Sequence, residues 1–328
     1  MRQFQILLKG IMLRRTKNLT IDGQPIVNLP LKTEEKVYAT FHKDEATWYH
    51  NIETYSQTLL QGYLSHESRR GYQTILTSLL HLRQACCHPY LHVADLGDVG
   101  NNGISAGKMV GVVKNQQEAM KPSTLKKLRR DAGKNESARM EYRRYLKEIW
   151  KPSAKVTKCL ERIKYIQLTK EKIIIFSQWT LLLNILEIPL TYELGIQYRR
   201  YDGTMTSESR SSAASDFASL PDVKVILVSL KAGNYGLNLN YASRVIILDP
   251  FWNPSIEAQA INRAHRIGQQ RAVHIYRILI QNTVEDRIVQ LQERKRDMIH
   301  NALDEGSREH IDTFYENNLA FLLGLGGR

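Results

Sequence analysis

Short runs of β-branched residues recur in the second half of the chain and predict buried strands. They span residues 172–176, 223–229, 244–249 and 272–280, and amphipathic segments lie between most of them. A strand that is apolar at every position is buried on both faces, and strands that alternate with helices pair in parallel. The pattern therefore predicts an α/β fold, in which helices cover both faces of a parallel sheet.

The first half of the chain has a mainly helical pattern. After a short strand at residues 36–41, apolar residues at spacings of three and four predict helices over residues 44–64 and 72–86. Pro89 ends the second helix, because proline disfavours the helical conformation in the residue before it. Glycine and asparagine are frequent in residues 96–111, which predicts a flexible loop and a boundary.

Length and composition place the chain among globular proteins. It has 328 residues, of which 42% are hydrophobic and 8% aromatic, enough to bury one large core or two smaller ones. No stretch approaches the roughly 18 apolar residues of a membrane span, so we expect a soluble intracellular protein. Three cysteines, Cys86, Cys87 and Cys159, are too few for a disulfide framework or a four-cysteine zinc site. We expect them to be buried as small hydrophobic residues.

The net charge of +13 is concentrated in one segment. Residues 108–172 contain 19 Lys or Arg against seven Asp or Glu, and the rest of the chain, with 27 basic and 26 acidic residues, is nearly neutral. Within this segment, residues 125–150 predict a strongly basic helical stretch. A localised basic segment favours a polyanionic partner such as nucleic acid, but a charged, solvent-exposed linker helix explains the composition equally well.

Two arginines in residues 259–269 are the strongest candidates for chemistry. Pro254 suits the first turn of a helix, and in that helix Gln259, Arg263 and Arg266 would lie four and three residues apart on one face. Two guanidinium groups on one face can bind a terminal phosphate and neutralise the charge that develops as a phosphoryl group departs, which is the arginine-finger role. A solvated basic helix face is the alternative interpretation.

Three further blocks follow the carboxyl ends of predicted strands, where α/β sheets bind ligands. Residues 177–179 are Ser-Gln-Trp, and residues 249–254 form a proline-bounded aromatic segment. Residues 229–239 contain Gly233 and Gly236, which allow close approach of the backbone and could cradle a phosphate. A glycine pair alone is more often a turn, but this pair follows a buried strand.

The blocks at 176–179, 229–239, 249–254 and 259–269, in this order and spacing, resemble motifs four to six of the Swi/Snf-type ATPases of helicase superfamily two. These motors remodel chromatin and act in DNA repair, and the blocks belong to their second RecA-like lobe. The resemblance is closest to the fungal DNA-repair-associated subgroup, and it extends from residue 1 to about residue 304.

The resemblance implies roles for individual residues. Those expected at the nucleotide are Gly236, Gln259, Arg263 and Arg266, of which Arg263 and Arg266 would be the catalytic arginine fingers. Those expected at the DNA backbone are Ser177, Lys231 and Asn238. For Lys231, a solvated surface lysine is a serious alternative.

The resemblance also implies a cofactor and partners. We expect ATP with magnesium, whose ligands would come from a first RecA-like lobe supplied in cis or in trans, and we expect no metal site in this chain. The expected partner is double-stranded DNA or chromatin, without a membrane partner, and the expected location is the nucleus.

Four segments follow from the same resemblance. Residues 1–91 would hold the end of the first lobe and a helical protrusion region, residues 92–150 a flexible loop and basic insertion, residues 151–305 the second RecA-like lobe, and residues 306–328 a tail. The subgroup often carries a zinc RING before the second lobe. Residues 92–150 contain no cysteine, so a RING and its ubiquitin-ligase activity are not implied.

Departures from the family pattern leave two functions open. Asn262 and Asn234 stand where the family has Asp and Gly, and Asn262 removes a negative charge beside Arg263. The sequence also lacks Gly-x-x-x-x-Gly-Lys-Ser/Thr and a strand-linked Asp-Glu pair. The chain would therefore be the carboxyl-terminal part of a DNA-stimulated ATPase, inactive alone, or a non-hydrolysing DNA- or protein-binding relic. An enzyme with its own nucleophile is not supported, because His265 is better interpreted as a packing residue.

Overall fold

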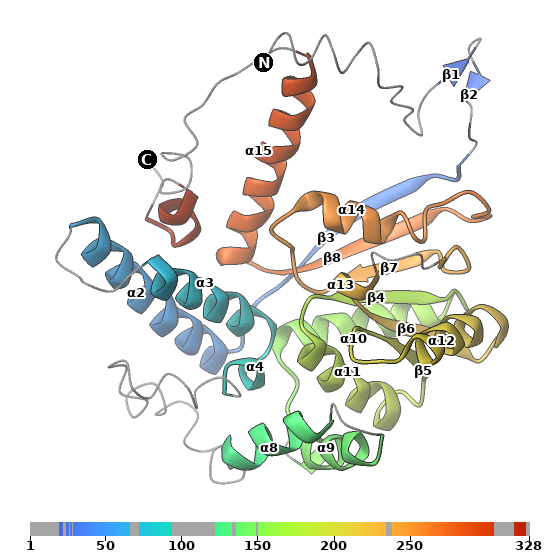
Figure 1. The fold of residues 1–328 in the computed structure, drawn as a ribbon, viewed down its shortest axis with the longest axis horizontal. Coiled ribbons are helices and arrows are strands. Elements are labelled where there is room, and N and C mark those ends of the chain that lie inside the picture. The colour runs from blue at the N-terminus through green and yellow to red at the C-terminus, as the bar shows by residue number, and fades with distance from the viewer. Residues whose placement is uncertain are drawn as a thin grey trace.

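The fold is organised around one sheet of six parallel strands (Figure 1). The computed structural model describes residues 20–21, 24–25, 27, 29–65, 72–93, 122–132, 136–148, 150–233, 238–304 and 318–325. The strand order is β3-β8-β7-β4-β6-β5, which confirms the predicted parallel α/β sheet. The bounds are β3 Lys32–Ala39, β4 Ile173–Ser177, β5 Gln197–Tyr201, β6 Val223–Ser229, β7 Arg244–Ile247 and β8 Val273–Ile280. A separate short hairpin pairs β1 (Thr20–Ile21) with β2 (Gln24–Pro25).

Helices cover both faces of this sheet, because alternate residues of each strand point to opposite sides. Ile173 and Ile175 of β4 pack in one core with α10 (Ala154–Gln167) and α11 (Thr180–Tyr192). Ile174 and Phe176 pack in a second core with α12 (Ser207–Ser219) and α14 (Pro254–Ile261). Every residue of β4 is therefore buried, which explains the uninterrupted apolar run that predicts it.

Two edge strands differ from the sequence prediction. β3 covers residues 32–39 instead of 36–41 and pairs with β8 along its whole length. The sequence prediction places residues 32–39 in the segment 1–91, before the second lobe, whereas in the structure they form the edge strand of this sheet. β5, at the opposite edge, escaped prediction because its sequence Gln-Tyr-Arg-Arg-Tyr contains no β-branched residue. Polar residues are tolerated there, since an edge strand has only one neighbour.

α2 (Lys43–Leu64) and α3 (Tyr72–Cys87) pack side by side next to the sheet (Figure 1). Together with α15 (Val284–Asp304) and residues 318–322, they enclose a third core around Leu60, Ile75 and Ile288. Both helices match the prediction within one residue at each end, and α3 ends just before His88 and Pro89, as expected.

His88 joins this helical region to the sheet domain. Its buried ring accepts a hydrogen bond at Nδ1 from the backbone N–H of Tyr90 (3.1 Å), so Nε2 carries the proton and donates to the carbonyl oxygen of Lys151 (3.0 Å). Burial lowers the pKa of His88 to about 4, because a charged ring would lose its hydration. Nearby, the Ser153 hydroxyl accepts from the N–H of Val156 (3.2 Å) and caps α10.

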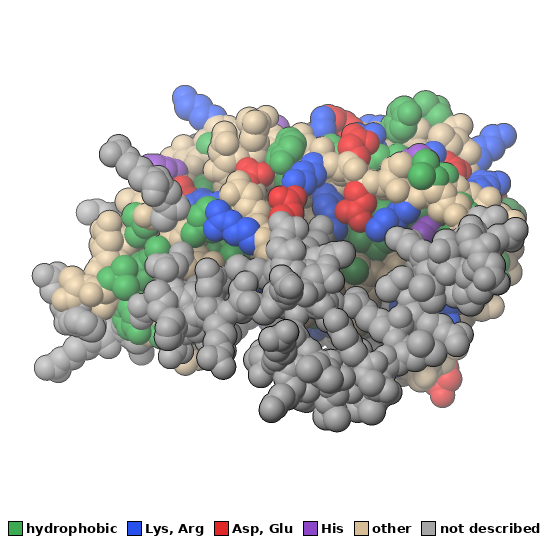
Figure 2. Space-filling view, turned by 90° about the horizontal axis from the view of Figure 1, so that it is seen from above, with side chains coloured by type: hydrophobic (Ala, Val, Ile, Leu, Met, Phe, Trp, Pro, Cys, Tyr) green, Lys and Arg blue, Asp and Glu red, His purple; other side chains and the backbone are tan. Residues whose placement is uncertain are grey.

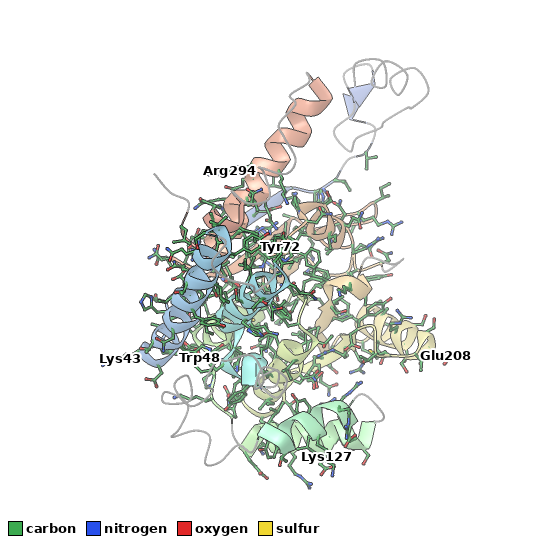
Figure 3. The ribbon with its side chains drawn as sticks, turned by 60° about the vertical axis from the view of Figure 1, so that its left-hand side comes forward. Lys43, Trp48, Tyr72, Lys127, Glu208 and Arg294 are labelled. Atoms are coloured by element: carbon green, nitrogen blue, oxygen red, sulfur yellow. The ribbon has the colours of Figure 1, made fainter. Side chains whose placement is uncertain are left out.

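The basic segment forms α8 (Pro122–Ala132) and α9 (Glu136–Glu148), which confirms its helical character. α9 packs against α11: Tyr142 and Leu146 are buried, and Nε of Arg143 lies 2.6 Å from the carboxylate of Glu187. One side of α9 is therefore packed against the sheet domain, while Arg144 and Lys147 stay exposed. Lys127 on α8 lies at the opposite end of the molecule from Arg294 on α15 (Figure 3).

All three cysteines are buried thiols, as predicted, and burial raises the pKa of Cys159 to about 12. Within the described residues, no helix combines the length and the apolar character that crossing a membrane requires.

Candidate functional site

The carboxyl ends of β4 and β7 meet around the buried carboxylate of Asp249. The Ser177 hydroxyl donates to Oδ2 at 2.5 Å, and the backbone N–H of Gln178 donates to Oδ1 at 3.0 Å. Burial raises the pKa of Asp249, although these hydrogen bonds oppose the shift. Ser177 is 0% exposed, so its hydroxyl is not presented to a DNA backbone. The expected DNA contact is corrected to a structural role: Ser177 fastens the turn that follows β4.

The side chains of Lys231 and Asn238 are exposed, as contacts with DNA would require. Lys231 lies in α13 (Leu230–Gly233), directly after β6, where the hydroxyl of Ser229 accepts a hydrogen bond from the N–H of Ala232 at 3.3 Å. Gly236 lies outside the described residues. A solvated lysine would be equally exposed, so the DNA-binding role of this pair stays a prediction.

The two arginines lie in a turn beyond α14, and the predicted helical face is wrong. α14 ends at Ile261, and Asn262 is its C-terminal cap. The N–H of Arg263 donates to the Ala260 carbonyl at 3.0 Å, a bond that spans only three residues and marks tighter winding than an α-helix. Gln259 remains on α14, so it does not share one regular helical face with Arg263 and Arg266. Gln259 and Arg266 are exposed, and Arg263 is half-buried.

Residues 262–272, the arginine turn, are fixed by contacts to the segment before β7. The carbonyl oxygen of Arg263 accepts from the N–H of Leu239 at 3.0 Å. Gln269, which is 7% exposed, donates from Nε2 to the carbonyl of Ala242 at 2.8 Å. The arginine turn is thereby tied to the same stretch of chain at two points, once through the Arg263 backbone and once through the Gln269 side chain.

The arginine turn lies at the amino ends of the strands. Leu239 and Ala242 precede β7, and His265 Nε2 lies 2.9 Å from the carbonyl oxygen of Pro30, just before β3. α14 carries the chain from the carboxyl end of β7 back to the amino end of β8, as a crossover between parallel strands must. Ser177 and Lys231 thus lie at the carboxyl ends of β4 and β6, as expected, whereas the arginines lie at the opposite edge of the sheet. His265 is a packing residue, as expected.

Gly268 gives the arginine turn its shape. Its φ is +96°, and a Cβ atom there would lie 2.8 Å from Nδ2 of Asn240. A residue without a side chain is therefore required for the chain to turn back against Asn240. Arg266 and Ile267, just before it, project into solvent.

Sequence reasoning missed a group of buried polar side chains around residues 248–252, between β7 and α14. They are Arg83, Lys155, Glu257, Glu285 and Gln292. The sequence signal that could have revealed this group is a charged residue on the buried side of a helix, as for Lys155 in α10. Asn253 Oδ1 caps α14 by accepting from the N–H of Ser255 at 3.0 Å, and the Arg83 guanidinium carbon lies 4.6 Å from the Trp252 ring.

Charges of both signs are interspersed on the face seen from above, where described Lys and Arg side chains lie beside Asp and Glu side chains (Figure 2). This face therefore shows no large described patch of one sign, and a polyanion on it would meet individual cations.

Comparison with known proteins agrees with this fold. Residues 154–268 match the model for the helicase conserved C-terminal domain, and residues 1–91 match that for the SNF2-related domain. An ATP-dependent helicase of Schizosaccharomyces pombe is 32% identical over 428 residues, covering 100% of this chain and 41% of the relative. The DNA repair protein RAD5A of Arabidopsis thaliana is 31% identical over 368 residues, covering 91% and 35%. The Sulfolobus solfataricus SWI2/SNF2 ATPase core in complex with dsDNA has a TM-score of 0.58 and 24% identity, covering 98% of this chain and 55% of that one.

A parallel sheet whose last crossover helix leads into an arginine turn defines this chain as a carboxyl-terminal helicase lobe with the RecA-like fold. More particularly, the chain belongs to the Swi/Snf-type family of helicase superfamily two. It spans less than half the length of the two relatives.

Proposed function

We propose that this chain supplies the second lobe of an ATP-dependent, DNA-stimulated translocase in which Arg263 and Arg266 act as arginine fingers. Membership of the family supports ATP dependence in general terms. The residues that grip the phosphates and hold magnesium would come from a first RecA-like lobe, in cis or in trans. The chain alone would then be inactive.

The observation that carries the proposal is the hydrogen bond between the N–H of Leu239 and the carbonyl oxygen of Arg263, at 3.0 Å. Leu239 is fully buried, and its neighbour Asn238 is an exposed candidate for DNA contact. A displacement of Asn238 by DNA would therefore reach the backbone of Arg263 through a single main-chain bond. Stimulation of hydrolysis by DNA requires a connection of this kind.

The side chains of the arginine turn suit a terminal phosphate. Arg266 is exposed, and a guanidinium carries a permanent positive charge and five donors in a fixed planar arrangement. ATP with magnesium, when bound, supplies the phosphoryl group that is transferred. Arg263 and Arg266 would neutralise the charge that develops on its oxygens, and Gln259 would lie beside them. For Gly236, the proposed contact rests on the motif alone.

Double-stranded DNA or chromatin is the proposed partner, and the nucleus is the proposed location. The name of the A. thaliana relative refers to DNA repair, and the S. solfataricus structure contains dsDNA. In this chain, the exposed side chains of Lys231 and Asn238 are available for phosphate contacts. The exposed cations of α8 and α9 offer a second surface for the same polyanion.

The proposal predicts that Arg266→Ala abolishes ATP turnover but leaves DNA affinity within about twofold, because the arginine acts on the departing phosphoryl group. The assay is DNA-stimulated hydrolysis by a protein that contains this chain together with a first RecA-like lobe. Arg271→Ala is the matched control, since Arg271 is also exposed and lies in the same turn. Near wild-type turnover by Arg266→Ala would refute the finger assignment. DNA binding without any turnover by the unmodified protein would instead favour the non-hydrolysing relic.

A further inference from the structure

Charged side chains from two helices hold the backbone that leads into α14. Lys155 of α10 donates from Nζ to the carbonyl oxygen of Leu248 at 2.8 Å. Arg83 of α3 donates from Nη2 to the carbonyl oxygen of Pro250 at 2.8 Å. Lys155 is 0% exposed and Arg83 is 3% exposed, so water does not compete for these carbonyl groups.

Two further side chains hold the next residue, Phe251. Its carbonyl oxygen accepts a hydrogen bond from Gln292 of α15, and its N–H donates to Oε1 of Glu257 at 2.6 Å. Glu257 lies in the first turn of α14 and is also ion-paired with Arg277 of β8. Residues of four helices, α3, α10, α14 and α15, therefore fix the path of the chain immediately before α14.

Arg83 is the member of this set that comes from the α2–α3 region. Its guanidinium carbon lies 4.6 Å from the ring of Trp252 and 5.8 Å from the ring of Trp179, and the carboxylate of Asp249 is a nearby opposite charge. Burial lowers the pKa of Arg83, and Asp249 opposes that shift. A buried charge is weak support for stability alone, because an apolar side chain of similar volume often serves the fold as well. The contacts of Arg83 are better explained if this residue is needed to hold residues 250–252 in one position.

A shift at residues 250–252 would be transmitted to the arginine turn. α14 has only 8 residues and ends at Ile261, two residues before Arg263. A helix of two turns behaves as a rigid rod, so it passes a displacement of its first residue on to its last. In catalysis, misplacement of a reacting group by 1 Å can reduce the rate about 100-fold.

We propose that Arg83 is a positioning residue, which holds residues 250–252 so that α14 places Arg263 and Arg266 against the phosphate. The inference rests on the proposed function of those two arginines. It adds that the α2–α3 region, which lies outside the sheet, determines the position of the arginine turn. A movement of α3 relative to the sheet would change the reach of the arginines without any change within the turn.

The first test is hydrogen–deuterium exchange on the chain itself. Arg83→Met keeps the aliphatic bulk of the side chain but removes its donors and charge. We expect faster amide exchange in residues 250–266, with no change in β4. Arg287→Met is the matched control, because Arg287 is also partly buried and pairs with Glu53 of α2, away from residues 248–252. It should change exchange in α2 and α15 only.

The second test is steady-state ATP hydrolysis by the two-lobe protein. Arg83→Met should lower kcat at least about tenfold, while KM for ATP and the affinity for DNA change less than about twofold, because only the arginine placement is altered. Arg83→Lys should recover part of kcat, since lysine restores the charge and one donor but not the planar fork.

Loosened exchange with an unchanged kcat would overturn the positioning role and leave the finger assignment intact. An equal loss of kcat in Arg287→Met would also overturn it, because the effect would then be general destabilisation. If turnover by the unmodified protein does not depend on Arg266, both the proposed function and this inference fail. If Arg83→Met does not fold, Arg83→Lys alone decides, and wild-type kcat in that variant contradicts the need for a guanidinium that is stacked on the Trp252 ring.

Discussion

Three glycine substitutions separate the shape of the arginine turn from the general stability of the fold. Gly268→Ala places a methyl group 2.8 Å from the Asn240 side chain at φ +96°. Gly195→Ala introduces a side chain at a φ of +59° where nothing lies within 4 Å. Gly203→Ala also meets open space and has no positive φ. The first lies two residues from Arg266, and the other two lie away from it.

The expected magnitudes follow from backbone strain. A left-handed conformation costs a residue with a side chain about 1 to 2 kcal/mol. We therefore expect about 1 kcal/mol for Gly195→Ala and about 2 kcal/mol for Gly268→Ala, where the amide of Asn240 must also move aside. Gly203→Ala should stay within about 0.5 kcal/mol. An unfolding entropy of about 2.1 cal/mol/K per residue over 328 residues converts 1 kcal/mol into a Tm shift of roughly 1.5 °C.

Thermal unfolding followed by circular dichroism, together with ATP turnover of the two-lobe protein, measures both effects. Gly268→Ala should lower Tm by about 3 °C and kcat at least about tenfold, because the strain is released by moving Arg266. Gly195→Ala should lower Tm by about 1.5 °C with turnover within about twofold of wild type. If Gly268→Ala is as stable as Gly203→Ala, the turn does not need its left-handed glycine. If Gly195→Ala loses turnover equally, stability rather than arginine geometry explains the loss.

Two further predictions concern DNA binding and pH. Lys127, Arg130 and Arg144 are exposed, and replacing all three by Gln should weaken DNA binding. In a salt titration, the slope of log K against log salt should become shallower by up to about 2.7. An unchanged slope would show that α8 and α9 do not touch phosphates. His88, whose pKa falls from 6.5 to about 4 in the fold, should make the chain lose stability as pH drops through that window, because only the unfolded state takes up the proton. Urea unfolding at several pH values should show a loss approaching about 3 kcal/mol, and His88→Gln should flatten the profile; a stability that rises as pH falls would contradict the buried neutral ring.

The sequence predicts the centre of the sheet well and its edges poorly, for a physical reason. β4, β6, β7 and β8 have neighbours on both sides and helices on both faces, so most of their side chains are apolar and the run is visible. β5 has one neighbour, and its arginines form ion pairs: Arg199 with Asp216 at 2.7 Å and Arg200 with Asp202 at 2.7 Å. The charged residues of β5 can be partly buried only because these aspartates pair with them, and the local sequence does not show which residues form the pairs.

The candidate site shows the same limit. Ser177 follows an apolar strand, where a short polar residue is either exposed to a ligand or buried against a partner. The deciding partner, Asp249, lies 72 residues further along the chain. Similarly, the spacing of Arg263 and Arg266 fits a helical face, but the helix ends first, at a C-terminal cap formed by Asn262. Asparagine at that position is itself a helix-stop signal.

The separation of the site residues onto two edges of the sheet limits how DNA can act on the arginines. Lys231 lies at the carboxyl end of β6, and the arginine turn lies at the amino ends of β7 and β8. Two connections between these edges are described: the bond from Leu239 to Arg263, and the held segment 248–252 that continues into α14. The first enters the arginine turn at its start, and the second sets the position of the helix that precedes it. A DNA contact at Asn238 would therefore change the turn itself, whereas a movement of α3 would change where the whole turn stands. Gly268→Ala perturbs the arginine turn, and Arg83→Met perturbs the position of that turn. Under the proposed function, both variants reduce turnover only by misplacing Arg266. The double variant should therefore lose no more turnover than the more severe of the two single variants.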